Sequence, residues 1–181
     1  IAIIGLILFS SLTLPHFEWS SLQQNALPNG VSGIFKALPF AIWFFLAIEG
    51  LANVAEETKN PQKNIVIGFS RALLTLVILC VVTYFASVGV SGWQAIVFPN
   101  GGTETSDAPL PLALSNVPGL DPGLIKTVVA IGVFGLIASF HGIILAAGRT
   151  TFEFGRVGYA PSFLGKIGEK TKTPIYALIF N

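Results

Sequence analysis

Apolar residues occur along the chain in long, nearly uninterrupted runs. Residues 37–55 are apolar apart from Glu49 and Asn53, and residues 72–92 carry no charge. Residues 127–148 also carry no charge, and His141 is their only readily titratable group. Each run is long enough, at about 1.5 Å per residue, to cross the roughly 30 Å hydrocarbon layer of a bilayer. The pattern therefore predicts three complete membrane-spanning helices.

Two further apolar runs lie at the ends of the chain. Ile1 opens directly into a run to Leu14, without an initiator Met or a basic segment, so this run is not a signal peptide. Another run begins after Pro174. We expect both to be parts of further spanning helices of a longer protein. The predicted fold class is all-α and polytopic, one membrane domain with spans at residues 1–14 (partial), 37–55, 66–92, 124–148 and 175–181 (partial).

The distribution of basic residues predicts the orientation. Of the 10 Lys and Arg residues, all but Lys36 and Lys126 fall around two of the four connections between spans. They are Lys59, Lys63, Arg71, Arg149, Arg156, Lys166, Lys170 and Lys172. Because basic residues favour the cytoplasmic side, residues 56–65 and 149–174 are predicted cytoplasmic loops. Residues 15–36 and 93–123 are then predicted external loops.

Two of these connections are expected to contain helical structure. The external segment 93–123 is rich in Pro, Gly and Ser and favours a short helix near residues 111–116. Aromatic and aliphatic residues alternate with basic ones over residues 149–173. This pattern indicates an extension of the preceding helix, a turn near residues 158–161 and a stretch along the inner membrane surface.

Composition agrees with the membrane class and excludes several functions. The chain is 52% hydrophobic and 10% charged, against about a quarter charged in a soluble domain. A net charge of +1 argues against a nucleic-acid partner. One Cys, Cys80, and two distant His residues provide no zinc cluster, and no phosphate-binding glycine loop is present in the sequence. We therefore expect no cofactor, no metal and no enzymatic activity, so uphill transport would use an ion gradient or exchange.

Glu49 is the most informative residue of the sequence. A carboxylate in the middle of a span costs about 2.5–3.5 kcal/mol on insertion scales, which favours a functional role. Glu49, Asn53 and Glu56 recur at helical spacing and would line one helix face. We interpret this face as part of a substrate-binding or gating surface. The alternative, a protonated Glu that only bonds to a neighbouring helix, stays open.

Gly50, directly after Glu49, suggests a break in the same helix. Local unwinding between Phe45 and Gly50 would free backbone carbonyls, which persist at membrane depth only where they line a site. Carbonyls at a helix C-terminus suit an ammonium group, and Trp43 or Phe44 could add a cation–π contact. For each aromatic residue, a lipid-facing or packing role remains the alternative.

The last complete span carries a stripe of small residues and one histidine. We interpret the stripe as a close-packing seam between helices. It consists of Gly132, Gly135, Ser139, Gly142 and Ala146. His141 lies on a different face and is a candidate proton relay. An internally hydrogen-bonded core histidine is an equal alternative.

Two stretches resemble a known family. AIWFFLAIEGLANVAEETKNPQKNI, residues 41–65, resembles the sixth membrane helix and following loop of the amino acid–polyamine–organocation permeases, above all in residues 56–62. LIASFHGIILAAGRTTFEFGRVGYAPSFLGK, residues 136–166, is similar to the eighth helix and its cytoplasmic extension. With GGTETSDAPLPLAL, residues 101–114, these stretches are most similar to bacterial ethanolamine permeases. The resemblance covers the chain from the end of helix five to the start of helix nine.

The resemblance implies two inverted five-helix repeats, with helices one and six broken around a midplane site. In such permeases the break in helix six supplies aromatic side chains and backbone carbonyls to the substrate pocket. The residues at those positions are Trp43, Phe44, Phe45, Ala47, Ile48 and Glu49. Many relatives that carry amino acids also have a Glu at the position of Glu49, so this residue supports gating or proton coupling without selecting an amine. The family's first helix, with its glycine-rich substrate loop, is not in the chain.

The favoured hypothesis is alternating-access transport of ethanolamine or a similar small amine across the inner (cytoplasmic) membrane, coupled to protons or by exchange. An amino-acid permease of the same superfamily is the first alternative. An amine-binding membrane sensor or channel subunit is an alternative of another class. The expected partners are the small amine or amino acid, the lipid bilayer and protons, with a homo-oligomer left open.

Overall fold

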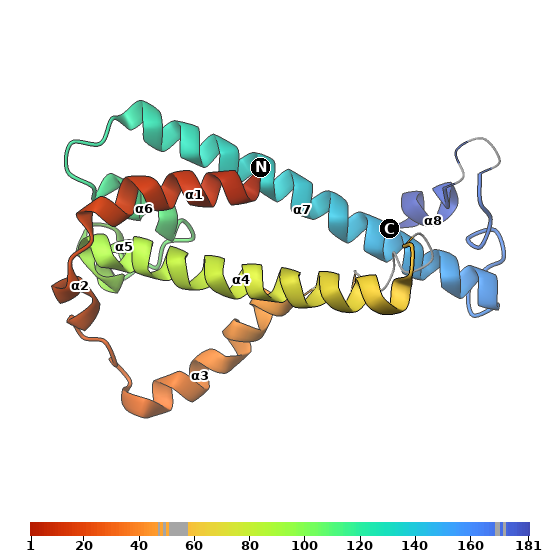
Figure 1. Ribbon diagram of the computed structural model, residues 1–181, viewed down its shortest axis with the longest axis horizontal. Helices are drawn as coiled ribbons and strands as arrows, with labels where there is room; N and C mark the ends of the chain where they lie inside the picture. The colour runs from red at the N-terminus through yellow and green to blue at the C-terminus, as the bar shows by residue number, and fades with distance from the viewer. Residues whose placement is uncertain (47, 49, 51–57, 169–170, 172) are drawn as a thin grey trace. The chain divides into compact units, whose positions relative to one another are not determined.

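The computed structural model describes residues 1–46, 48, 50, 58–168, 171 and 173–181. All regular secondary structure within them is helical (Figure 1). The predicted all-α fold class is therefore confirmed for these residues. The chain divides into two compact units. Unit 1 comprises Ile1–Phe45 and Ser70–Gly135, and unit 2 comprises Leu46–Phe69 and Leu136–Asn181.

The α-helices follow one another as labelled in Figure 1. They are α1 (Ala2–Thr13), α2 (Trp19–Gln23), α3 (Gly30–Ile42), α4 (Pro61–Ser91), α5 (Trp93–Val97), α6 (Pro109–Ser115), α7 (Pro122–Val157) and α8 (Ile175–Phe180). The 3₁₀ turns whose bounds fall wholly within the described residues are η1 (Leu14–His16), η2 (Trp43–Phe45) and η4 (Pro99–Gly101).

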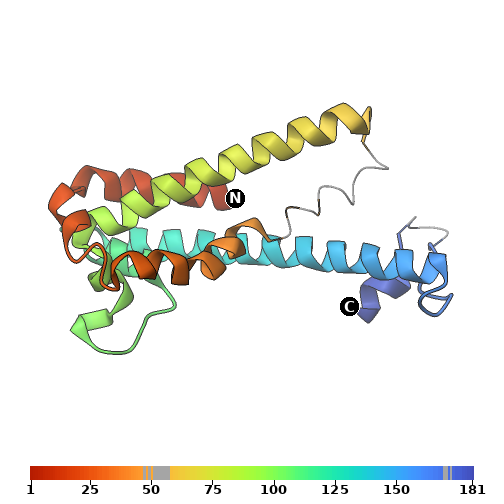
Figure 2. The same cartoon turned by 90° about the horizontal axis from the view of Figure 1, so that it is seen from below.

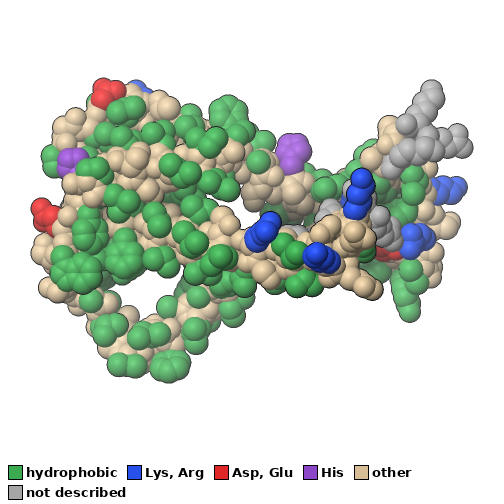
Figure 3. Space-filling model, in the orientation of Figure 1, with side chains coloured by type: hydrophobic (Ala, Val, Ile, Leu, Met, Phe, Trp, Pro, Cys, Tyr) green, Lys and Arg blue, Asp and Glu red, His purple; other side chains and the backbone are tan. Residues whose placement is uncertain are grey.

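Among the described residues, α4 and α7 are the helices long and apolar enough to cross a membrane. They contain 31 and 36 residues, more than the about 20 that a bilayer requires. Each begins with a proline, which suits the first helical position because its missing N–H would have no partner there. Their large apolar side chains are mostly exposed, and Figure 3 shows hydrophobic side chains over much of the visible surface.

Helix α7 continues beyond the predicted span, into the segment where a helical extension was expected. It ends at Val157, and Gly158 follows with a φ of +93°, a conformation that glycine adopts without strain. The amides of Tyr159 and Ala160 both donate to the carbonyl of Phe154, at 2.9 and 3.0 Å. This bonding pattern is that of a glycine-terminated helix end. The chain therefore turns where the sequence predicts a turn.

Helix α4 begins within the predicted cytoplasmic loop 56–65. Its first residue is Pro61, so residues 61–65 are helical rather than loop. The carbonyl of Asn60 accepts hydrogen bonds from the amides of Lys63 and Asn64, at 3.1 and 3.0 Å, which extends the helix through these polar residues. Polar side chains at the end of a spanning helix do not interrupt its backbone bonding.

The predicted external loop 15–36 is also partly helical. It contains α2 and the first turns of α3, which begins at Gly30 rather than at residue 37. Val31, Ile34 and Phe35 recur at helical spacing there. The external segment 93–123 likewise contains α5, η4, α6 and the start of α7. Of these, α6 lies over the stretch where the sequence predicts a short helix.

Unit 1 has a side-chain core. Its buried members come from α1, α4, α5, α6 and α7, and they are Phe9, Ala86, Val88, Ile96, Ala113, Leu114 and Val128. Helix α1 lies beside the second half of α4 and the first half of α7 (Figures 1 and 2). A Cβ added at Gly5 would lie 2.9 Å from Ile131 Cγ2, so α1 and α7 approach closely at this glycine.

Unit 2 packs the end of α7 against the following segment. A Cβ on Gly155 would overlap the backbone of Gly165, and one on Gly148 would overlap the side chain of Leu178 in α8. The side-chain amide of Asn181 donates to Thr151 Oγ1 and to the carbonyl of Ala177, both at 2.8 Å. The glycines thus let this segment lie directly on the helix backbone.

Candidate substrate site

The structure describes only part of the segment in which the sequence predicts a helix break. The α-helical part of the predicted span 37–55 ends at Ile42, and η2 follows from Trp43 to Phe45. Pro39 lies within the last turns of α3, where it lacks an N–H and crowds the carbonyl of Phe35. The α-helix nevertheless continues for three residues beyond Pro39 before the 3₁₀ turn begins.

The three consecutive aromatic residues of η2 do not form one wall. A 3₁₀ turn has three residues per turn, so successive side chains point about 120° apart. Trp43, Phe44 and Phe45 are 74%, 59% and 42% exposed. One of them at a time can therefore face a given ligand from this turn. The C-terminal end of α3 beside them supplies the partial negative charge that an ammonium group prefers.

The remaining predicted residues of the break are described only in part. Ile48 and Gly50 adopt 3₁₀ geometry, and a Cβ on Gly50 would meet nothing within 4 Å. Ala47, Glu49 and Asn53 lie outside the described residues. The predicted helix face that carries Glu49 and Asn53 therefore stays a prediction.

His141 is exposed on α7 in unit 2, and its Nδ1 lies 3.0 Å from the carbonyl oxygen of Ile137. A carbonyl only accepts hydrogen bonds, so Nδ1 carries the proton in this arrangement and Nε2 is the basic nitrogen. This bond gives one of the two ring nitrogens of His141 a hydrogen-bond partner within its own helix. It is compatible with either of the two roles that the sequence leaves open.

The predicted small-residue seam is close-packed at one of its glycines. A Cβ on Gly135 would lie 3.3 Å from the Cβ of Ala2, in α1. Added Cβ atoms on Gly132 and Gly142 would meet nothing within 4 Å. A depression of about 390 Å³ farther along α7 is lined by Leu136, Ile137, Ser139, Phe140 and Ile143. This lining is almost wholly apolar and offers little to a polar substrate.

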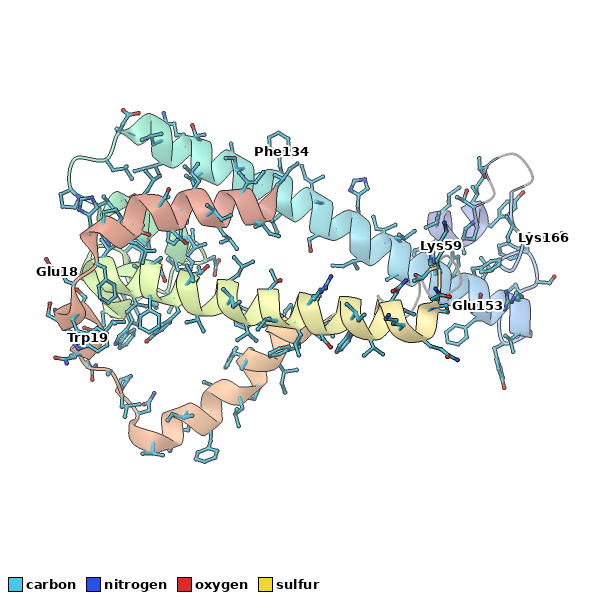
Figure 4. The ribbon with its side chains drawn as sticks, in the orientation of Figure 1. Glu18, Trp19, Lys59, Phe134, Glu153 and Lys166 are labelled. Atoms are coloured by element: carbon cyan, nitrogen blue, oxygen red, sulfur yellow. The ribbon has the colours of Figure 1, made fainter. Side chains whose placement is uncertain are left out.

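Unit 1 contains a more polar pocket that the sequence analysis missed. It has a volume of about 350 Å³ and is lined by Pro15, His16, Phe17, Glu18, Val90, Asn116 and Pro118. Figure 4 labels Glu18 at the junction of α1 and α2. In the sequence, Glu18 can be found as an acidic residue four positions after the apolar run that ends at Leu14. Its proximity to Asn116, about a hundred residues later, comes only from the fold.

No three His, Cys, Asp or Glu side chains in the described part of the chain are grouped so as to hold a metal ion.

The family model described as Amino acid permease matches residues 1–181. An uncharacterized transporter of Rhizobium meliloti (strain 1021) is 30% identical over 172 residues, which are 95% of this chain and 35% of that protein. The branched-chain amino acid permease BcaP of Bacillus subtilis (strain 168) is 29% identical over 167 residues, 92% of this chain and 33% of that permease. The methylthioribose transporter of the same organism is 29% identical over 150 residues, 82% of this chain and 30% of that transporter.

No solved structure matches the chain significantly. The chain spans about a third of the length of the curated relatives named above. Their names share the role of transporter or permease and differ in the molecule transported, and none of them mentions ethanolamine.

Proposed function

Because this chain belongs to the amino acid permease family, we propose that the complete protein performs secondary active transport of a small molecule bearing an ammonium group. The observation that carries the proposal is the family match over residues 1–181. That match supports the predicted permease superfamily and a membrane transporter rather than an enzyme. We also propose that the protein lies in the cytoplasmic membrane. In this orientation, α4 begins and α7 ends at the cytoplasmic side of the bilayer.

The substrate class is an amino acid or a small amine. Amino acids are favoured by the names of several relatives, whereas ethanolamine rests on the resemblance of residues 101–114 and its neighbouring stretches. Both substrates carry an ammonium group. The end of α3 suits this group, because a helix C-terminus presents carbonyl oxygens and partial negative charge. The ring of Trp43, the most exposed of η2, is the proposed cation–π partner.

Glu49 is proposed to gate this site or to couple transport to protons, with Asn53 on the same helix face. His141 is the proposed second proton-handling group, through Nε2. The basis for Glu49 is the cost of a carboxylate in an apolar run. The basis for His141 is that its Nδ1–H is already bonded to Ile137, which leaves Nε2 to exchange a proton.

Counterflow in proteoliposomes that contain the full-length protein tests the transport proposal. Vesicles preloaded with unlabelled ethanolamine, glycine or alanine are expected to accumulate the matching labelled compound transiently. Excess glycine or alanine abolishes labelled ethanolamine uptake if amino acids are the substrates, and leaves it unchanged if the site selects an amine without a carboxylate. Binding of these compounds without counterflow would favour the sensor alternative and overturn transport.

A Glu49→Gln variant tests the residue assignment. We expect initial uptake to fall by about 100-fold, the scale of losing one proton-transferring group, and its pH dependence to flatten. Glu153→Gln is the matched control, since Glu153 is 44% exposed and pairs with Arg156 at 3.3 Å on α7. If uptake and its pH profile stay unchanged in Glu49→Gln, the role assigned to Glu49 is wrong.

A further inference from the structure

The polar pocket of unit 1 is assembled from four separate elements. His16 ends η1, Glu18 is the N-cap residue of α2, Val90 lies in the last turn of α4, and Asn116 is the C-cap residue of α6. The charge distribution of the sequence predicts that this end of α4 faces the external side. None of the lining residues belongs to the end of α3 or to η2, so the pocket is distinct from the proposed substrate site.

Hydrogen bonds and ring packing hold the walls of the pocket in place. The amide of Glu18 donates to the carbonyl of Gly89 at 2.8 Å, which ties the start of α2 to α4. The side-chain amide of Asn116 donates to Ser91 Oγ at 2.9 Å, which ties α6 to the end of the same helix. The ring of Phe17 lies against Gly89 so closely that a Cβ there would overlap it. These contacts define the pocket without relying on long flexible side chains.

The electrostatics of the pocket favour a cation. Glu18 is the carboxylate of the lining, which contains no Lys or Arg. Its side chain accepts a long hydrogen bond from Ser20 Oγ at 3.4 Å and makes no ion pair within the described residues. The C-terminus of α4, at Ser91, adds partial negative charge at the same place. Asn116 uses its NH₂ group on Ser91, which leaves its carbonyl oxygen as an acceptor.

We propose that this pocket is a peripheral binding site for a small organic ammonium ion. The Glu18 carboxylate is the counter-ion, and the side-chain oxygen of Asn116 accepts a hydrogen bond from the ammonium group. A volume of about 350 Å³ is sufficient for a compact amine and lies at the small end of ligand pockets. The inference rests on the proposed function for its ligand class, because the transported substrate is proposed to carry the same group.

The site distinguishes between the two candidate substrates. Ethanolamine has an ammonium group and a neutral hydroxyl, so it gains the attraction of Glu18 without a penalty. Glycine carries a carboxylate within a few ångströms of its ammonium group, and this second charge is repelled by Glu18. Ethanolamine should therefore bind this pocket more tightly than glycine, whichever of them the protein transports.

Thiol protection in the full-length protein tests the site. The native thiol is removed by Cys80→Ala, and a reporter thiol is introduced at the rim by Pro118→Cys. The alkylation rate by a membrane-impermeant maleimide is then measured with ethanolamine, glycine or ethylene glycol, which matches ethanolamine in size but lacks the charge. Ethanolamine at twice its dissociation constant is expected to slow alkylation about threefold, because a third of the sites stay empty. Glycine should protect less, and ethylene glycol not at all.

Two further variants in the same background assign the effect to the carboxylate. Glu18→Gln is expected to abolish protection by ethanolamine, whereas Glu104→Gln, an exposed acid in the segment between α5 and α6 that does not line the pocket, should preserve it. An unreactive reporter thiol, equal protection by ethylene glycol, or protection that survives Glu18→Gln would each overturn the site. Protection without counterflow would overturn the proposed transport and retain the site. Counterflow without protection would retain the proposed transport and overturn the site.

Discussion

Unit 1 and unit 2 bury their residues in different ways. The core of unit 1 consists of interlocking side chains from several helices, with Phe9 at 1% and Leu114 at 0% exposure. Glycines of unit 1, such as Gly89, approach side chains, whereas in unit 2 Gly155 lies directly against the backbone of Gly165. Side-chain packing forms the core of the first unit, and a contact between two backbones at glycine is the feature of the second.

The difference determines how each unit should respond to a change in volume. A side-chain core that loses atoms retains a cavity, because its neighbours relax only partly. A glycine contact that gains a methyl group must separate two backbones, which have no rotamers to change. Loss of side-chain atoms should therefore be most damaging in the core of unit 1, and an added methyl group should be damaging at the backbone contact of Gly155 in unit 2.

The largest effect is expected for Phe9→Ala in unit 1. Truncation of this fully buried ring should lower the free energy of unfolding of the full-length protein by about 3–5 kcal/mol. The measurement is a denaturant titration in mixed micelles. Phe134→Ala is the control, because Phe134 is 58% exposed on α7 of the same unit (Figure 4). Equal losses for the two variants would mean that the buried cluster does not stabilise unit 1 in the way described.

A smaller loss, about 2 kcal/mol, is expected for Gly155→Ala in unit 2. The new methyl group would overlap the backbone of Gly165, so the segment after α7 must shift. Limited proteolysis should then cut residues 158–168 faster than in the parent protein. Gly142→Ala makes the same substitution on the same helix in open space and should leave both measurements nearly unchanged. If Gly142→Ala is equally harmful, the close contact at Gly155 is not the cause.

The sequence predicts the long elements well because one physical effect dominates them. A run such as 72–92 leaves an apolar chain no alternative to a helix that satisfies its own backbone in lipid. The turn at Gly158 is also predictable from the sequence, because the residue with positive φ after a helix end is usually glycine. By contrast, the start of α3 at Gly30 was missed, because moderately apolar residues at helical spacing also occur in loops.

The candidate site is less accessible to sequence reasoning than the fold. Gly50 predicts a break between Phe45 and Gly50, but only the structure shows that the α-helix stops at Ile42 and that a 3₁₀ turn follows. The pocket at Glu18 depends on contacts with α4 and α6 that are distant in the sequence. No local sequence pattern predicts that these helix ends lie together, so the pocket can be recognised only from the three-dimensional structure.

The smallest effects concern one polar link in each unit. In unit 1, Trp93 Nε1 donates to the carbonyl of Asn25 at 3.0 Å, across 68 residues of chain. In unit 2, Asn181 donates to Thr151 Oγ1 at 2.8 Å and also to a carbonyl of its own helix. Trp93→Phe keeps most of the ring but removes the donor, so a loss of about 1 kcal/mol is expected.

Thr151→Val should cost less, about 0.5 kcal/mol, because Asn181 retains its bond to Ala177 and water can reach the exposed amide. The same mixed-micelle titration measures both variants. The ordering follows from the partners that remain. Trp93→Phe leaves the carbonyl of Asn25 without this donor, whereas Thr151 lies where the Gly148 contact with Leu178 already fixes α8 to α7. A Thr151→Val loss larger than that of Trp93→Phe would reverse this ordering and show that the hydrogen bond, rather than the glycine contact, holds α8 in place.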